Sequence, residues 1–497
     1  MVRGVKEEMI MATDKMVKKP TQTPLLEVKD FSLSFRRFER GLRETNLEVI
    51  RKLDLTINEG EIVAVVGASG SGKSLLANAI LGVLPDHAVM KGTLNYKGEA
   101  LSHKRLLALR GKDISLIPQS VNALDPLMKT GKQVQTVIRG KNKEVIRNAI
   151  FQKVGLAEEA GDRYPFELSG GMARRVLAAT AMVSGAKLVI ADEPTPGLDP
   201  DALRETIKHL RQMANDGKGI MLITHDIEAA LQVADKVAVF NAGQTVEIAR
   251  ADDFSGKGEK LQHPYTKALW NALPQNEFIT IDRTQHFESG SSDGGVSNLD
   301  VQGISYGYPN TPQLFKELNL SIKPGEIVGV FGYSGSGKST MAQIIAGYLK
   351  PKMGTIMLDS QTVPVSGNHP IQLVWQHPEK AINPRWRMKQ VLEEAGNLEP
   401  ELLGTFGIKK AWLERWPSEL SGGELQRFCL ARALVGDVKY LIADEMTTML
   451  DAVTQAQIWQ AVIKLARKRN IGVLAISHDH HLLQRVSNRV IDFSKLT

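Results

Sequence analysis

Cysteine is almost absent from this chain: Cys429 is the single example among 497 residues. One thiol excludes an internal disulfide and any zinc or iron–sulfur site built from cysteines alone. Cys429 lies in the helical pattern QRFCLARAL, which favours a small core residue over a nucleophile. Long hydrophobic runs are also missing, because no apolar stretch approaches the ~20 residues that a membrane-spanning helix requires.

Targeting signals and clustered charge are missing as well. Residues 1–24 mix Lys, Glu and Met without a continuous apolar core, which is typical of a flexible leader and not of a signal peptide. The net charge of +7 is small for this length, and no basic cluster indicates nucleic-acid binding. A 42% hydrophobic and 24% charged composition is that of an ordinary globular protein, and the length predicts two or three domains.

What the chain does contain is a tandem repeat. Four blocks recur in the same order, each 252 to 265 residues later: GEIVAVVGASGSGKS (60–74) and GEIVGVFGYSGSGKS (325–339), LSGG (168–171 and 420–423), LVIADEPT (188–195) and YLIADEMT (440–447), ITHD (223–226) and ISHD (476–479). This pattern predicts two homologous domains, 25–275 and 299–497, joined by a Gly/Ser-rich linker at 276–298. Apolar β-type runs alternate with helical patterns, so each domain is expected to be α/β with a largely parallel sheet.

Each copy has a glycine-rich loop between an apolar strand and a helix, the arrangement of a phosphate-binding loop. Glycines let backbone N–H groups surround the phosphates, the lysine neutralises phosphate charge, and the following serine hydroxyl suits Mg²⁺. The predicted nucleotide-binding residues are Gly67, Ser69, Gly70, Gly72, Lys73 and Ser74 in the first copy, and Gly332, Ser334, Gly335, Gly337, Lys338 and Ser339 in the second.

Carboxylates follow a second apolar strand in each copy. Asp192 and Asp444 end these strands at the sheet edge where parallel sheets bind ligands, and they are predicted to hold Mg²⁺. Glu193 and Glu445 come next, and each is predicted to polarise the attacking water. A solvated acidic turn is the alternative for either pair alone.

Four further polar residues end strands in the same way. His225 and His478 follow apolar runs and are predicted to contact the γ-phosphate, although a lone histidine there is more often structural. Gln119 and Gln376 are predicted to reach both Mg²⁺ and the attacking water.

In this order, the phosphate loop, strand-end glutamine, LSGG, DE strand and strand-end histidine resemble the ATP-binding cassette superfamily, twice over nearly the whole chain. The resemblance implies two P-loop NTPase domains, each with a RecA-like α/β core and a helical signature subdomain, hydrolysing ATP with Mg²⁺. It also implies that two cassettes pack head to tail, so that the LSGG turn of one caps the ATP of the other. Ser169, Gly170 and Gly171 would then complete the site of Lys338, and Ser421, Gly422 and Gly423 that of Lys73. GLDP (197–200) and MLDA (449–452) resemble the loop that crosses this interface, with Asp199 and Asp451 as its acids.

Adenine stacking is assigned to Phe35 and Tyr308, with Tyr306 as a rival and core packing as the alternative for all three. Departures between the copies are few: Arg174 stands where the second copy has Gln426, and Met446 replaces a proline. No catalytic group is lost, so both sites are expected to hydrolyse ATP.

Residues 263–274, HPYTKALWNALP, resemble the end of ATPases in the peptide/nickel importer class. NALDPLMKTGKQV and KAINPRWRMKQVLEEAG resemble the stretches that pack against the permease in that class. The resemblance implies a fused ATPase pair on the cytoplasmic face of the cell membrane, with two permease subunits and indirectly a solute-binding protein as partners. Peptides, nickel, metal chelates and opine-like solutes remain open as cargo.

Other classes of cassette protein fit this sequence less well. A ribosome-binding translation factor usually has a longer, charged arm between its cassettes, and a DNA-repair ATPase needs zinc-binding cysteines. A sugar-importer ATPase commonly has one degraded site, whereas both sites here look intact.

Overall fold

The computed structural model describes residues 23–39, 43–68, 70–195, 200–278, 298–309, 312–332, 335–363, 369–396, 399–448 and 450–496. The predicted site residues Ser69, Asp199 and Ser334 lie outside this part of the chain. So do nearly all of the predicted leader and linker.

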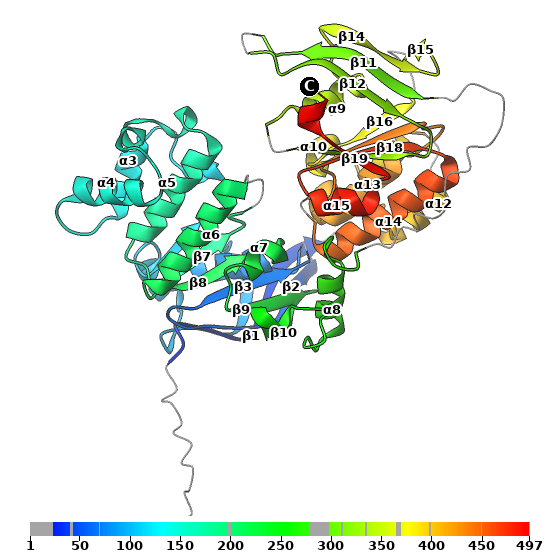
Figure 1. The fold of residues 1–497 in the computed structure, drawn as a ribbon. Coiled ribbons are helices and arrows are strands. Elements are labelled where there is room, and N and C mark those ends of the chain that lie inside the picture. Colours follow the sequence, from blue (N-terminus) through cyan, green and yellow to red (C-terminus); the bar gives the residue numbers. More distant parts are fainter. Residues whose placement is uncertain are drawn as a thin grey trace, which may run out of the picture.

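The same parallel five-stranded core occurs in both halves (Figure 1). In the first half its order is β6 (Ile114–Ile117), β7 (Leu188–Asp192), β8 (Gly219–Ile223), β3 (Ile62–Gly67) and β9 (Lys236–Asn241). In the second half the order is β16 (Ile371–Val374), β17 (Tyr440–Asp444), β18 (Gly472–Ser477), β13 (Ile327–Phe331) and β19 (Arg489–Asp492). These strands are short, apolar and mostly buried, as expected for a sheet covered on both faces. The predicted α/β class with a largely parallel sheet is confirmed.

Antiparallel strands flank each core. In the first half they are β1 (Leu26–Glu39), β2 (Arg43–Ile57), β4 (Ala88–Tyr96), β5 (Glu99–Ala100) and β10 (Gln244–Arg250). In the second they are β11 (Leu299–Tyr306), β12 (Phe315–Ile322), β14 (Met353–Leu358) and β15 (Gln361–Thr362). In the first half β10 pairs with β2 at Gln244 and Lys52 and joins both layers into one ten-stranded sheet, whereas the second half keeps sheets of four and five strands.

A helix follows each phosphate loop: α1 (Lys73–Leu81) and α9 (Lys338–Ile345). Between the strand that bears the glutamine and the strand that bears the DE pair, each half inserts a helical arm. The arms are α3 (Thr130–Val137), α4 (Lys143–Lys153) and α5 (Gly170–Val183), and α11 (Met388–Glu393), α12 (Pro400–Thr405) and α13 (Gly422–Ala433). The first arm has a core of its own and lies at the left of the view in Figure 1, away from the second half.

The remaining helices are α2 (His103–Leu109), α6 (Pro200–Asn215), α7 (Ile227–Leu231), α8 (Pro264–Asn271), α10 (Pro378–Ala381), α14 (Ala452–Arg469) and α15 (His480–Val486). Cys429, on α13, is buried in the core of the second half, and this burial raises the pKa of its thiol to about 12. The prediction that Cys429 is a small core residue is therefore confirmed.

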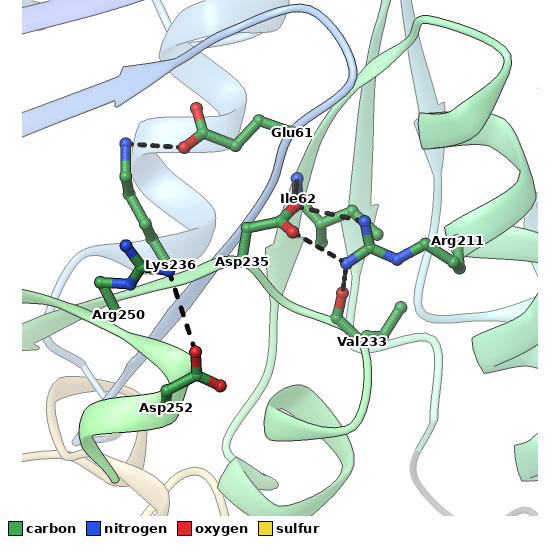
Figure 2. A network of polar contacts seen from close by, with 8 residues as sticks. All are labelled: Glu61, Ile62, Arg211, Val233, Asp235, Lys236, Arg250 and Asp252. Carbon is green, nitrogen blue, oxygen red and sulfur yellow. Dashed lines mark hydrogen bonds and ion pairs between the residues drawn. The ribbon is translucent and has the colours of Figure 1, made fainter.

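A polar clamp holds the strand before the first phosphate loop in place (Figure 2). The Asp235 carboxylate accepts hydrogen bonds from the backbone N–H of Ile62 at 2.8 Å and from Arg211 at 3.1 Å. Next to it, Lys236 Nζ lies 2.7 Å from Glu61 Oε1. The clamp joins the start of β9 to the start of β3, so the loop that follows β3 leaves the sheet from an anchored strand.

The second half has the same clamp with different chemistry. The backbone N–H of Ile327 donates to Asn488 Oδ1 at 2.8 Å, and Arg489 Nε lies 2.7 Å from Glu326 Oε1. An amide thus replaces a carboxylate while the hydrogen bond to the strand is kept.

The two halves contact each other through the end of the first and the C-terminal helices of the second. Ala452, at the start of α14, is buried in the hydrophobic core of the first half. Arg485, on α15, donates to the backbone carbonyls of Pro274 at 2.9 Å and Asn276 at 2.5 Å.

Candidate functional site

The first phosphate loop surrounds the ammonium group of Lys73. Gly67 (φ 145°) and Gly72 (φ 100°) have backbone conformations that side-chain-bearing residues rarely adopt, and Gly72 is the N-cap of α1. Lys73 is buried and donates to the carbonyls of Gly67 at 2.7 Å and Ala68 at 3.0 Å. Burial lowers the pKa of Lys73. A cation and a helix N-terminus therefore meet at one point, which suits a phosphate.

The second loop repeats the buried lysine and the glycine N-cap. Gly337 (φ 106°) is the N-cap of α9, and Lys338 is buried with a pKa that burial lowers. Its Nζ lies 3.8 Å from Glu445 Oε1, so here the lysine approaches the predicted catalytic carboxylate.

The strand-end aspartates lie beside the serines of the loops. Ser74 Oγ donates to Asp192 Oδ1 at 3.4 Å, and burial raises the pKa of Asp192. Burial also raises the pKa of Asp444 to about 6, an effect opposed by a hydrogen bond from Ser339. Asp444 Oδ1 is buried and has no hydrogen-bond partner within the described residues.

These oxygens fit Mg²⁺, which prefers hydroxyl, carboxylate and phosphate oxygens. The described residues include no group of three or more His, Cys, Asp and Glu side chains able to hold a metal alone. Any magnesium site here therefore depends on the serine hydroxyls and the nucleotide for its other ligands.

The predicted catalytic glutamates are held in an unusual backbone conformation. Glu193 and Glu445 both have φ 48°, a left-handed value uncommon outside glycine. The His225 ring lies 3.0 Å from Glu193, and the His478 ring lies 3.3 Å from Glu445. Such strain persists only where surrounding contacts impose it, and it is often found at functional sites.

Charge near Glu445 sets its protonation. Burial alone would raise the pKa of Glu445, but His478 and Lys338 together hold it below the ordinary value. The Glu445 carboxylate, 3.3 Å from the His478 ring, raises the pKa of His478, and burial opposes that rise. In the first half, burial lowers the pKa of His225, but Glu193 outweighs it and raises the pKa above its ordinary value.

The strand-end glutamines lie close to the glutamates. Gln376 Nε2 donates to Glu445 Oε2 at 3.1 Å and to Thr448 Oγ1 at 3.3 Å. Gln119 and Glu193 line one cleft. Sequence reasoning missed Thr448, which lies three residues after Glu445 and whose hydrogen bond to Gln376 no single motif indicates.

The two signature serines both begin helices. Ser421 is the N-cap of α13 and accepts from the N–H of Glu424 at 3.3 Å, while Glu424 accepts from the N–H of Ser421 at 2.9 Å. Ser169 caps α5 by accepting from the N–H of Met172 at 3.3 Å. Because methionine cannot return the second hydrogen bond, the first signature has half of this capping box.

The second signature lies against the first phosphate loop. A Cβ placed on Gly70 would lie 3.9 Å from the Cβ of Ser421, which is 351 residues further along the chain. Asp451 is close enough to Lys73 to oppose the fall in its pKa. With Ala452 in the core of the first half, the site of Lys73 is built from both halves.

The second phosphate loop is open by comparison. A Cβ on Gly335, Gly170 or Gly171 would meet no described atom within 4 Å. A cleft of about 1080 Å³ separates these parts, lined by Arg174 from the first arm and by Lys338 and Glu445 from the second half. The second signature therefore lies against the first phosphate loop, whereas the described glycines of the first signature and of the second loop have no such neighbour.

The predicted adenine-stacking residues differ in position. Tyr308 is 43% exposed, lines the cleft beside Lys338, and its hydroxyl lies 3.1 Å from Thr340 Oγ1. Tyr306 packs edge-on against Tyr308 at 5.3 Å. Phe35 packs on the core of its own half, with its ring 5.5 Å from that of His87.

Comparisons with known proteins agree with this geometry. A family model described as ABC transporter matches residues 50–196 and 315–448. The chain is 32% identical to the uncharacterized ABC transporter ATP-binding protein YejF of Escherichia coli (strain K12), covering 95% of this chain and 94% of that protein. It is 30% identical to the glutathione import ATP-binding protein GsiA of Pectobacterium atrosepticum, covering 94% and 84%. It is 29% identical to the peptidoglycan transport ATP-binding protein YejF of Agrobacterium fabrum, covering 96% and 92%.

Among solved structures, the archaeal ribosome recycling factor aABCE1, in complex with the stalk protein aP1, superposes with a TM-score of 0.59. The match covers 92% of this chain and 87% of that one at 21% identity, so it shows a shared fold alone.

Fold and site together define a P-loop ATPase with two ATP-binding cassettes. The chain belongs to the ABC transporter family, as the sequence predicts, and its relatives are named as ATP-binding proteins. Within the described residues no helix has the length and apolar character needed to cross a membrane.

Proposed function

We propose that this chain is the energy-coupling ATPase pair of an ABC importer. Residues 25–275 and 299–497 are the two cassettes and 276–298 is the linker between them. The linker keeps the cassettes at high effective concentration, so that the closed pair forms within one molecule.

Two ATP molecules bind at shared sites in this proposal. Ser421 and Asp451 complete the site of Lys73, and Ser169 completes that of Lys338. The approach of Ser421 to Gly70 is the observation that carries the proposal. The open cleft at Lys338 is consistent with a cycle in which the sites close separately.

In this proposal, catalysis depends on how charged and polar groups are positioned around the phosphates. Lys73 and Lys338 neutralise phosphate charge, and the helix N-termini behind them donate backbone N–H groups. Glu193 and Glu445 orient the attacking water, and the neighbouring histidines hold them in place and contact the γ-phosphate. When bound, Mg²⁺ would be held by Ser74, Asp192 and Gln119, or by Ser339, Asp444 and Gln376, and would supply further charge stabilisation.

The partners are two permease subunits, reached from the cytoplasmic face of the membrane, and indirectly a solute-binding protein. Relatives named for import and for peptidoglycan transport support this assignment. The same names favour peptides and peptide-derived solutes as cargo over nickel, metal chelates or opines.

The test measures solute uptake by cells. A strain lacking the gene should lose uptake of radiolabelled glutathione or of a labelled tripeptide, and the wild-type gene should restore it. A Glu193→Gln, Glu445→Gln double variant should express equally and fail to restore uptake. Normal uptake in the deletion strain, combined with sedimentation of the chain with ribosomes in the presence of ATP, would refute the importer assignment.

A further inference from the structure

Each helical arm contains two loops that lie side by side, which we call the first tip (residues 125–130 and 162–167) and the second tip (residues 383–388 and 414–419). Identical backbone hydrogen bonds hold the loops together: Thr130 N–H to Arg163 O at 2.9 Å, and Met388 N–H to Arg415 O at 3.0 Å. The tips are therefore equivalent positions, and they can be compared residue by residue.

The loop turns are also equivalent. Asp125 accepts from the N–H of Leu127 at 2.9 Å, and Asn383 accepts from the N–H of Arg385 at 3.0 Å. The same turn thus presents a leucine in one half and an arginine in the other. Leu127 is 87% exposed, which leaves a large apolar side chain in water.

Aromatic and apolar groups dominate the first tip. Phe166 is 74% exposed and stacks on Tyr164 at 5.5 Å, and Met128 is also exposed. The ionisable residues of this tip are Lys129, Arg163, Asp125, Asp162 and Glu167, so carboxylates outnumber cations. Lys129 is already paired with Asp162 at 3.7 Å. An apolar partner surface matches this tip.

Cations dominate the second tip. Its ionisable residues are Arg385, Arg387, Arg415, Glu414 and Glu419. Arg387 stacks over the half-exposed Trp416 ring at 4.9 Å, and Ser418 occupies the place that Phe166 has in the first tip. Glu419 is used internally, because it accepts from the N–H of Trp416 at 3.0 Å. Arg387 is used internally as well, because it donates to the backbone carbonyl of Glu414, but Arg385 and Arg415 are exposed and match a partner surface that carries carboxylates.

We infer that the two tips select two chemically different permease chains: a cytoplasmic segment with an apolar face binds the first tip, and one with carboxylates binds the second. The inference rests on the proposed function. Because the cassettes are fused and their tips differ, the ATPase pair can dock on a two-chain permease in only one orientation.

Photo-cross-linking in the host cell tests the assignment. The photoreactive residue p-benzoylphenylalanine would replace Leu127 in one strain and Arg385 in another, and cross-linked peptides would be identified by mass spectrometry. We expect two different membrane proteins, with acidic residues in the segment captured from position 385. Leu47, exposed on β2 and remote from β6 in the sheet, is the control position and should capture neither protein.

Paired charge variants provide the second measurement. Leu127→Asp should weaken recovery of the first membrane protein about tenfold, and Arg385→Asp should do the same for the second, since buried interface anchors commonly contribute this much. Each should leave recovery of the other protein and the basal ATPase rate unchanged. The inference would be overturned if the same membrane protein were captured at both positions, or if none were captured. The importer function would still be tested separately by the uptake assay. Capture of ribosomal proteins would overturn both.

Discussion

Replacement of the signature serines by alanine tests whether each half completes the nucleotide site of the other. In a Lys338→Ala background only the site of Lys73 can turn over. Ser421→Ala should strongly reduce hydrolysis there, because Ser421 lies against Gly70 of that loop. In a Lys73→Ala background the same change should have little effect, and Ser169→Ala should give the mirror result.

The size of the expected rate loss follows from the hydrogen bond that Ser421→Ala removes. A hydrogen bond to a charged group contributes about 1.5–3 kcal/mol. Since about 1.4 kcal/mol corresponds to a factor of ten in rate, turnover at the affected site should fall roughly ten- to hundredfold. Ser421 also caps α13, and loss of a cap destabilises by about 1 kcal/mol.

Ser421→Asp separates these two effects. Aspartate caps a helix as well as serine does, but its charge repels the phosphate. We expect Ser421→Asp to unfold at the wild-type temperature and yet to hydrolyse no faster than Ser421→Ala. Phosphate release in the single-site backgrounds and thermal unfolding are the two assays. An equal loss from Ser421→Ala in both backgrounds would refute the crosswise pairing.

Three further predictions address single groups. Glu193→Gln and Glu445→Gln should each cut phosphate release substantially while nucleotide still binds, and full activity in either variant would contradict two working sites. Because burial holds the pKa of Asp444 near 6, its carboxylate is ionised above that pH and protonated below it. Mg²⁺-dependent binding of a fluorescent nucleotide at the second site should therefore weaken as pH falls through about 6. Asp444→Asn should abolish this pH dependence of nucleotide binding. Gly67→Ala should lower the unfolding temperature strongly, since its Cβ would lie 1.9 Å from a backbone carbonyl oxygen of β9. In the control variant Gly332→Ala the Cβ would meet its nearest atom at 3.2 Å, so the unfolding temperature should fall less. Equal shifts in the two variants would show that the close approach to β9 does not decide the loss of stability.

Much of the local structure could be predicted because short-range chemistry decides it. Gly72 and Gly337 begin helices in conformations that require glycine, and Ser169 and Ser421 cap the helices that follow them. Because each motif occurs twice at nearly the same spacing, the phosphate loops and the DE strands could be predicted from the spacing alone.

Other features depend on residues far apart in the chain. The hydrogen bond from Gln376 to Thr448, the open cleft at Lys338 and the packing of Phe35 on His87 have no signal in any single motif. Side chains of this kind are placed by the packing of whole elements, which propensity and periodicity do not encode.

The sequence by itself determined the class of protein, the two-fold repeat and the identity of the loops that hold phosphate, because these depend on backbone conformations and neighbouring residues. The family resemblance already implied that Ser421 completes the site of Lys73, and the structure has Ser421 beside Gly70 of that loop. Only the tertiary structure decided that Ala452 enters the core of the first half and that the cleft at Lys338 remains open. Contacts between residues several hundred positions apart arise when complete domains bury their surfaces against each other, and no local pattern specifies how far that closure has gone.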